Sequence, residues 1–385
     1  MESVVNNLNT LNARPGRLAG VARHMAAAVL AVATLAAAAA GGPDPIDTAA
    51  AQSAAALKRP LSGIAAQGST LVAVGAHGTI LLSEDAGATW KQAAVPVAAD
   101  LTTVRFTGPG VAWALGHDGV ALRSVDRGAT WSKVLDGRTL LALLNNHYRG
   151  LAARGDAGAV AVLDEVKRAA AQSATPDVLS YPFLDISIDA GGEGFLAGAF
   201  GLLLHTRDGG KSWEPWLERA DNDRRMHLYA LERAPDGLFY LAGEQGLLRR
   251  YDRAAGRFAK LESPYAGTFF GLKAGDAGLA AFGLRGSAFV SADGGTSWKQ
   301  VALGTEATVV DAVACAPGEM AFVTQDGRVL LGRGGKATDA GAARGGEVAG
   351  VAQAGAGLLV LAGSAGTRQV RIHGCGTDNA RIGKN

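Results

Sequence analysis

The most constraining feature of this sequence is a short motif that returns along the chain with a period near forty residues. It reads Ser/Thr-x-Asp-x-Gly-x-Ser/Thr-Trp, and its copies end at Trp90, Trp131, Trp213 and Trp298. A degenerate copy with one extra residue runs from Tyr251 to Phe258. The Asp positions 85, 126, 208, 252 and 293 are separated by 41, 82, 44 and 41 residues. Such a period indicates a chain built from repeated supersecondary units.

A second motif, Gly-x-x-Gly followed by an apolar run, precedes each Asp motif. Its paired glycines are Gly75/Gly78, Gly116/Gly119, Gly198/Gly201, Gly243/Gly246, Gly283/Gly286 and Gly363/Gly366. Another copy, at Thr324 and Gly327, keeps only the second glycine. Together these copies define seven units, of which the sixth and seventh lack the Asp motif.

The residues of the Asp motif are suited to closing a turn. Asp and Ser/Thr side chains accept hydrogen bonds from nearby backbone N–H groups. Glycine supplies the positive φ that such a turn needs, and the Trp ring covers the neighbouring sheet. The sequence therefore predicts structural roles for Ser83, Asp85, Gly87, Trp90, Ser124, Asp126, Gly128, Trp131, Thr206, Asp208, Gly210, Trp213, Ser291, Asp293, Gly295 and Trp298.

Each unit is predicted to hold four strands, which in the first unit are expected at residues 61–65, 70–74, 79–83 and 89–94. Four strands in about forty residues form the blade of a β-propeller. The predicted fold is all-β, a seven-bladed propeller with four-stranded antiparallel blades over residues 44–375. We expect a strand between Ile46 and Lys58 to complete the seventh blade, because that blade runs out of chain early.

The spacing of 82 residues between Asp126 and Asp208 predicts an insertion between blades two and three. Residues 138–176 show no strand alternation. They hold an apolar run at 140–144 and a second run from Val160 to Ala171, in a composition that favours helix. We predict two helices with a break at 155–158, serving a function or simply tolerated in a loop.

The N-terminus carries the parts of an export signal. Arg14, Arg17 and Arg23 precede an apolar run that ends in three alanines at Ala40. A basic segment, an apolar segment and an A-x-A end make up a signal peptide, and the run is shorter than the roughly 20 residues that span a bilayer. Residues 1–40 are therefore predicted to be a signal peptide, with an uncleaved membrane anchor as the alternative. The protein is expected in the periplasm or secreted, and residues 376–385 are expected to be a C-terminal tail.

Net charge and cysteine content limit which partners and metal sites we expect. The formal net charge is +2, without a basic stripe interleaved with aromatic residues, so nucleic acid is not an expected partner. Cys315 and Cys375 are the chain's two cysteines. Cys315 is either a small buried thiol or half of a single bridge to Cys375 in an oxidising compartment. Neither cysteine has the neighbours of a metal site.

The two motifs together resemble a known family. The Ser-x-Asp-x-Gly-x-Thr-Trp element resembles the Asp-box (BNR) repeat, and its arrangement with Gly-x-x-Gly resembles the photosystem II stability/assembly factor family. The resemblance covers roughly residues 46–372. It implies a scaffold that binds a protein partner and assists assembly or stability of a membrane or envelope complex, and we expect this scaffold to be monomeric and non-catalytic. Because sialidases and other glycosidases share the box, a carbohydrate-binding or glycan-cleaving propeller is the alternative.

The sequence lacks the catalytic signatures of that alternative. A sialidase would need an arginine cluster, a Tyr–Glu pair and usually Arg-Ile-Pro, and Arg-Ile-Pro does not occur here. Tyr229 and Tyr251 have an acid within three positions, Glu232 and Asp252. The chain has no H-E-x-x-H, P-loop, C-x-x-C or G-x-S-x-G motif. We predict no enzymatic activity, no cofactor and no metal, with a glycosidase as the residual possibility.

Strand order predicts two distinct faces. The Gly-x-x-Gly turn joins strands two and three of a blade and the Asp box joins strands three and four, so the turns lie at opposite ends. We call these ends the hairpin face and the box face. The hairpin face also receives the connections between blades and the helical insertion, so we expect the partner there. Its candidate residues are His77, His117, Asp118, Phe200, Arg224, Arg225, Glu244, Gln245, Arg285, Gln325 and Asp326.

Two details of this face are open at the sequence level. His77 and His117 are placed at equivalent hairpin positions, where they form either a small polar cluster or two exposed tips. The resemblance implies an arginine patch for partner contact, for which Arg224, Arg225 and Arg285 are the candidates.

Overall fold

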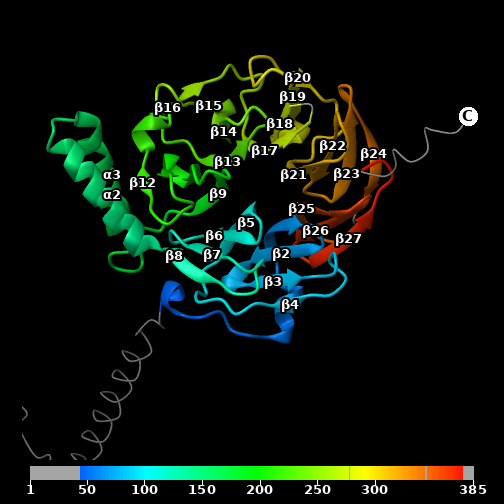
Figure 1. Ribbon diagram of the computed structural model, residues 1–385, viewed down its shortest axis with the longest axis horizontal. Helices are drawn as coiled ribbons and strands as arrows, with labels where there is room; N and C mark the ends of the chain where they lie inside the picture. The colour runs from blue at the N-terminus through cyan, green and yellow to red at the C-terminus, as the bar shows by residue number, and fades with distance from the viewer. Residues whose placement is uncertain (1–43, 277, 343–344, 376–385) are drawn as a thin grey trace, which may run out of the picture. The chain divides into compact units, whose positions relative to one another are not determined.

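The structure is a computed structural model that describes residues 44–276, 278–342 and 345–375. Pro45 to Cys375 contains seven antiparallel sheets, six of four strands and one of three, arranged as a ring (Figure 1). The predicted seven-bladed propeller is confirmed. The predicted signal peptide and tail lie outside the described residues. Among the helices that the structure describes, none is both long and apolar enough to cross a membrane.

The blades follow one another in sequence. Blade one contains β1 (Leu61–Gln67), β2 (Thr70–Gly75), β3 (Ile80–Ser83) and β4 (Lys91–Gln92). Blade two contains β5 (Leu101–Gly108), β6 (Val111–Gly116), β7 (Ala121–Ser124) and β8 (Ser132–Leu135). Blade three contains β9 (Phe183–Ile188), β10 (Gly194–Gly198), β11 (Leu203–Thr206) and β12 (Glu214–Pro215). Blade four contains β13 (Leu228–Arg233), β14 (Phe239–Gly243), β15 (Leu248–Asp252) and β16 (Arg257–Lys260).

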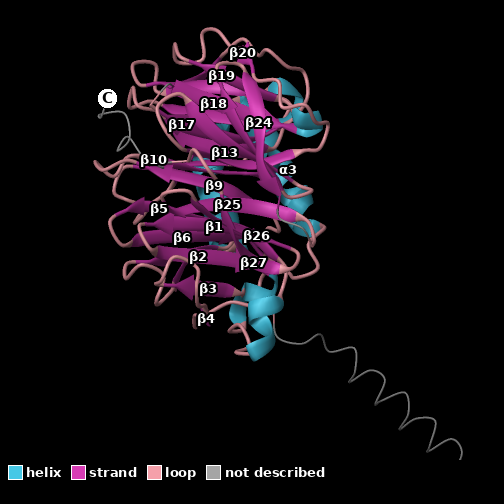
Figure 2. Ribbon diagram, turned by 90° about the vertical axis from the view of Figure 1, so that its right-hand side faces the viewer, coloured by secondary structure: helices cyan, strands magenta, loops and turns pink. Residues whose placement is uncertain are grey.

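The last three blades complete the ring. Blade five contains β17 (Phe269–Gly275), β18 (Gly278–Gly283), β19 (Ala288–Ser291) and β20 (Lys299–Gln300). Blade six contains β21 (Val309–Ala314), β22 (Glu319–Thr324), β23 (Arg328–Arg333) and β24 (Lys336–Ala342). Blade seven contains β25 (Val348–Gly355), β26 (Leu358–Gly363) and β27 (Gly366–Arg371). The first strands of neighbouring blades contact one another around the centre, and β1 meets β25 to close the ring (Figure 2).

Burial explains why the second strand of each blade is so apolar. Every residue of β2, β10 and β14 is buried, because these strands lie between two sheet neighbours and between two adjacent blades. Alternation of apolar and polar residues is therefore replaced by continuous apolar runs such as Leu71 to Val74, all at 0% exposure. Seven apolar clusters at or between the blades make up the core.

Each Asp box closes its turn with a repeated set of hydrogen bonds. In blade one the Ser83 hydroxyl donates to Asp85 Oδ1 (2.8 Å) and accepts from the backbone N–H of Gly87 (2.9 Å). The Asp85 carboxylate also accepts from the backbone and hydroxyl of Thr89 (2.9 and 2.6 Å). The boxes of blades two, three and five repeat this arrangement around Asp126, Asp208 and Asp293.

Two helices stand between blades two and three, as predicted. They are α2 (Gly137–Ala152) and α3 (Ala157–Ala171), and Asp136 caps α2 with a capping box. Leu140, Leu144 and Tyr148 of α2 are buried in the cluster that joins blades two and three. The Tyr148 hydroxyl donates to Glu218 (2.7 Å) and accepts from the backbone of Leu217 (3.1 Å). These contacts anchor the insertion to blade three.

The strand predicted between Ile46 and Lys58 is wrong. This stretch forms two short 3-10 helices, η1 (Pro45–Asp47) and η2 (Ala54–Lys58), and pairs with no strand. Ser53 caps η2 by accepting from the backbone of Ala55. The η2 helix still lies against β27, so the segment covers the outer strand of blade seven without extending its sheet.

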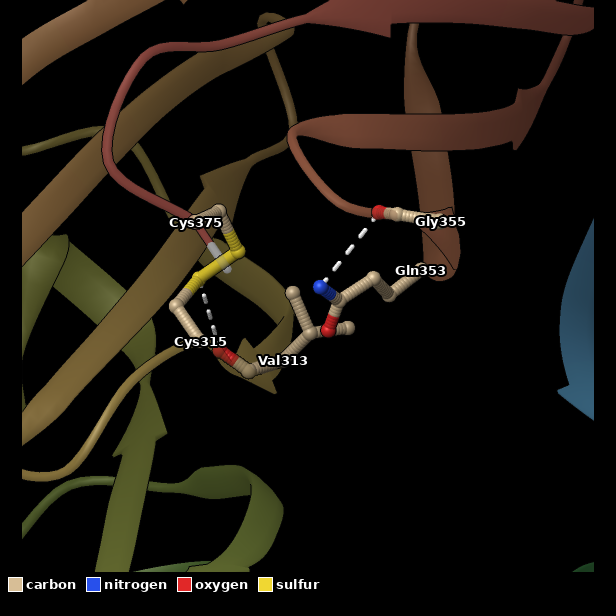
Figure 3. Close-up of a disulfide and its surroundings, with 5 residues drawn as sticks. All are labelled: Val313, Cys315, Gln353, Gly355 and Cys375. Atoms are coloured by element: carbon tan, nitrogen blue, oxygen red, sulfur yellow. Dashed lines mark hydrogen bonds between the residues drawn. A yellow bond between two sulfur atoms is a disulfide. The ribbon is translucent and has the colours of Figure 1, made fainter. Parts of the chain in front are cut away.

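A disulfide between Cys315 and Cys375 holds the C-terminal end of the propeller (Figure 3). Cys315 follows β21 of blade six, and Cys375 ends the segment 372–375 that follows β27. The backbone of Ile372 donates to Gly357 (2.9 Å), and both Ile372 and Cys375 are buried. We call residues 372–375 the clipped segment.

Candidate partner-binding face and central channel

The hairpin face is shaped by one recurring backbone conformation. Between the two glycines of five hairpins the chain makes a short turn, a 3-10 turn in four of them, whose third motif residue has a positive φ of 54–56°. These residues are His77, Asp118, Phe200, Gln245 and Arg285. Such φ values are uncommon outside glycine, so this conformation is a specific feature of the repeated turn. Because a different residue occupies the position in each blade, the hairpin face presents five different side chains at equivalent places.

This conformation corrects the placement of the histidines. His77 is equivalent to Asp118, and His117 occupies the preceding position, so the predicted equivalence of His77 and His117 is wrong. Asp100 lies between the two hairpins, because it accepts from the backbone N–H of His77 through Oδ1 (2.7 Å) and from that of His117 through its carbonyl (2.9 Å). Both histidines are exposed.

The candidate arginines differ in their surroundings. Arg225 has a positive φ of 52° and its Nε lies 3.3 Å from Glu165 of α3, so it ties the insertion to the chain entering blade four. Arg224 is exposed beside it. Arg285 is exposed at the hairpin of blade five. Arg224 and Arg225 are therefore neighbours at the entrance to blade four, whereas Arg285 lies on blade five.

Two acidic candidates have local partners. Glu244 accepts from the backbone N–H of His227 (2.7 Å) and contacts its Nδ1 (2.9 Å). Asp326 accepts from the hydroxyl of Thr324 in the blade-six hairpin. Glu244 therefore orients His227, and Asp326 closes its own turn while staying exposed.

Phe200 belongs to an arc of rings that the sequence did not reveal. Its ring lies 4.7 Å from Tyr181, which follows the insertion, and 4.9 Å from His227. His227 stacks near Tyr229 (5.8 Å), and Tyr229 meets Phe270 edge to face (5.1 Å). We call these five residues the aromatic arc. Phe200 is 42% exposed, unusual for a ring of this size.

The aromatic arc could not be assembled from the motifs alone. Tyr229 and Phe270 are the second residues of β13 and β17, a position filled by Ser62, Thr102 and Leu184 in blades one to three. An aromatic residue directly after the first buried residue of an inner strand is the signal that could have found them. Burial raises the pKa of Tyr229 and raises that of Tyr181 to about 12, so both stay neutral.

The aromatic arc borders two hollows. Tyr229 and Phe270 line the mouth of the central channel, a cavity of about 420 Å³ between the inner strands of all seven blades. Phe270 also borders a shallow hollow of about 510 Å³ at the hairpin face, together with Leu61, Val310 and Val348. The aromatic arc therefore runs on the hairpin face from the insertion to the channel mouth.

Charged side chains inside the channel link the blades. Asp185 of β9 receives two bonds from Arg105 of β5 (both 2.8 Å) and one from the backbone of Leu231 on β13 (2.8 Å). Asp311 of β21 likewise accepts from the backbone of Val351 on β25 (3.0 Å). Each aspartate thus connects its blade to the next one.

The remaining channel charges complete this network. Glu232 lies 4.0 Å from Arg105, and Lys273 lies 3.7 Å from Asp311. Burial raises the pKa of Glu232 despite its basic neighbours. Burial alone would lower the pKa of Arg105, but the Asp185 charge outweighs it and the net shift is upward. Asp185 and Asp311 are committed to structural bonds rather than poised as a catalytic pair.

Metal ligation is not evident in the described part of the chain, where no three His, Cys, Asp or Glu residues gather as a potential ligand set.

Comparison with known proteins supports the resemblance inferred from the motifs. Residues 60–125 match the family model described as Photosynthesis system II assembly factor YCF48. The chain is 35% identical over 71 residues to the chloroplastic photosystem II stability/assembly factor HCF136 of Arabidopsis thaliana. That match spans 18% of this chain and only 17% of the relative's length.

Solved structures agree in fold. A structure titled YCF48 bound to D1 peptide matches with a TM-score of 0.55 and 13% identity, over 82% of this chain and 92% of that one. YCF48 from Cyanidioschyzon merolae matches with a TM-score of 0.58 and 15% identity, over 82% and 96%. At these identities the likeness establishes the propeller fold alone. By sequence, the similarity to photosystem II assembly factors lies in the first two blades, within residues 60–125.

Proposed function

We propose that this chain is an exported scaffold that binds a polypeptide segment on its hairpin face and assists assembly or stability of a membrane or envelope complex. The observation that carries the proposal is the aromatic arc beside the channel mouth. The exposed ring of Phe200 and the half-buried ring of Tyr229 supply large contact area at low entropic cost, and such residues dominate binding energy at protein interfaces.

The comparisons support a polypeptide ligand. One fold neighbour is titled as a complex with a peptide, and the curated relative is named as a stability/assembly factor. The exposed Arg224 beside the aromatic arc would add attraction for acidic residues of the partner.

Export has its own support. The Cys315–Cys375 bridge is of the kind that persists in oxidising compartments, in agreement with the leader predicted for residues 1–40.

The test is affinity purification of the tagged protein from its own host after mild crosslinking, with mass spectrometry of the recovered proteins. We expect one membrane or envelope complex above background, and we expect its recovery to fall at least tenfold when Phe200 and Tyr229 are both changed to Ala. Val125→Ala is the matched control, because Val125 is 64% exposed on the box face.

Point variants are sharper than deleting the helices. Removing residues 138–176 would strip Leu144 and Tyr148 from the core between blades two and three, so loss of binding would report unfolding. Recovery of the same complex by the Phe200/Tyr229 variant would refute the aromatic arc as the contact. Recovery of no specific protein, together with binding on a glycan array, would favour the carbohydrate alternative.

A further inference from the structure

The junctions between blades are filled on the box face by a recurring device. A Cβ added to the box glycine Gly128 of blade two would lie 2.5 Å from Val72 of blade one. The same test places Gly210 of blade three 2.4 Å from Trp113 of blade two, and Gly87 of blade one 3.0 Å from Val360 of blade seven. Val72, Trp113 and Val360 each stand three residues before the first glycine of their hairpin. The box turn therefore packs onto one equivalent position of the preceding blade.

The box tryptophan adds a ring to the same junction. Trp131 is buried in the cluster that contains Val72 and Leu82 of blade one. Trp213 meets Trp113 of blade two edge to face at 5.9 Å. These indoles arrive from the surface on a peptide turn and fill the space between two blades.

Blades without a full box use substitutes at two junctions. In blade four the degenerate box supplies Phe258, fully buried with its ring 4.9 Å from Phe195 of blade three. In blade seven the clipped segment takes this place, where a Cβ on Gly374 would lie 2.9 Å from Leu331 of blade six. Leu331 is the counterpart of Leu82 in blade one.

Blade six supplies no such filler in the part that the structure describes. Gly332 stands where the boxes carry Ser or Thr, and Gly334 and Gly335 make a tight turn directly into β24. The facing residue of blade five is also smaller, because Ala280 occupies the position that Val72 holds in blade one. A cavity of about 300 Å³ opens between blades five and six at this place. Its lining includes Ala280, Val290, Val301, Met320 and Phe322.

We propose that this junction cavity is a binding site for an aromatic side chain, of tryptophan size, presented by a protein partner. The chemistry is inferred from the junctions between blades one and two and between blades two and three, where the indoles of Trp131 and Trp213, each carried on a peptide turn, fill the equivalent space. A cavity of about 300 Å³ is at the small end of ligand sites, which suits a single ring as anchor. Tryptophan and tyrosine side chains seated in well-packed pockets are enriched among the residues that dominate binding energy at interfaces.

Charge on the rim defines what flanks the ring. The ionisable lining residues are Asp276, Asp293, Lys299, Glu319 and Arg333, so acids outnumber bases. Glu319 and Arg333 pair with each other at 3.3 Å. Asp293 is ionised at neutral pH, because the bonds from Ser297 lower its pKa to about 2. The rim therefore complements a ring flanked by basic residues rather than acidic ones.

The probe is acetyl-Lys-Trp-Lys-amide, titrated against the folded protein carrying ¹³C-methyl methionine. Met320 lines the cavity and Met226 lies on the hairpin side, beside the aromatic arc, so one spectrum reports both sites. We expect the Met320 methyl signal to shift with a saturating, millimolar-range titration while the Met226 signal stays in place. Acetyl-Lys-Ala-Lys-amide should give no shift, and acetyl-Glu-Trp-Glu-amide should bind at least threefold more weakly.

Two variants test the location. Val290→Trp places a ring in the cavity from blade five and should weaken peptide binding at least tenfold. Val125→Trp adds the same ring on the box face of blade two, where Val125 is 64% exposed, and should leave binding unchanged. If Val290→Trp fails to fold, Ala280→Val introduces the residue found at this position in blades one and seven and should weaken binding at least threefold.

Two results would overturn the site. One is a Met320 signal unchanged at ten-millimolar peptide, and the other is binding that survives both Val290→Trp and Ala280→Val in folded protein. The proposal does not depend on the aromatic arc, because the cavity opens on the opposite face. A shift of Met226 without Met320 would likewise refute the junction cavity while leaving the hairpin-face proposal standing.

Discussion

Removing the Cys315–Cys375 disulfide should destabilise the propeller by about 4 kcal/mol. The bridge closes a loop between residues 60 positions apart. In the chain-entropy treatment a closed loop of this length removes about 14 cal/mol/K from the unfolded chain, which is about 4 kcal/mol at 25 °C. The double change Cys315→Ala with Cys375→Ala avoids a buried unpaired thiol or hydroxyl. The double variant leaves the buried Ile372 unchanged, so the core contacts of that side chain are retained.

The assay is equilibrium urea unfolding followed by tryptophan fluorescence, with the slope of the free energy against urea compared between proteins. A reductant should lower the midpoint of the natural chain to that of the double Ala variant and leave the variant unchanged. Hydrogen exchange at the Ile372 amide should also become faster without the disulfide, because Ile372 donates to Gly357 from within the clipped segment that the disulfide restrains. A loss of less than about 1 kcal/mol, with an unchanged slope, would refute the argument that the bridge restrains the unfolded chain.

Two further predictions concern charge. Asp185→Asn should lower the free energy of unfolding in urea by about 3 kcal/mol, because it leaves Arg105 without its buried charged partner. The control Asp47→Asn breaks an exposed pair with Arg138 and should lower it by less than about 1 kcal/mol. Equal losses in the two variants would contradict a stabilising role for the channel network. Hydrogen bonds from Thr130 and Ser212 lower the pKa of Asp126 and Asp208 from 3.8 to about 2. The folded state thus has the lower pKa, so the stabilisation is present above pH 4 and is lost as pH falls towards 2. The melting temperature should drop across this window, and less so in Asp208→Asn; a flat profile would contradict it.

The repeated motifs determined the architecture because their chemistry is local. A Ser-x-Asp-x-Gly-x-Thr-Trp segment closes its own turn with bonds spanning two to four residues. The Gly-x-x-Gly spacing fixes the hairpin in the same way. The number of blades, the two faces and the two helices of the insertion therefore follow from the sequence without knowledge of packing.

The mistakes arose where no local pattern decided the outcome. Residues 46–58 were expected to add a strand, but an edge position offers backbone groups without requiring a strand to use them, and the Ser53 cap favours a short helix. His77 and His117 were aligned by residue type, whereas their φ values depend on position within the turn.

Only the tertiary structure decided the candidate sites. The aromatic arc joins Tyr181 and Phe200 of the blade-three region to Phe270 of blade five. The junction cavity exists because blade six lacks the turn that its neighbours place on the preceding blade, while the clipped segment fills the next junction along. The sequence by itself determined the repeating blade, since each turn is stabilised by bonds within a few residues. The tertiary structure decided which aromatic side chains meet and which junction between blades stays open. Both depend on closure of the propeller, because closure brings residues that are far apart in the chain into contact.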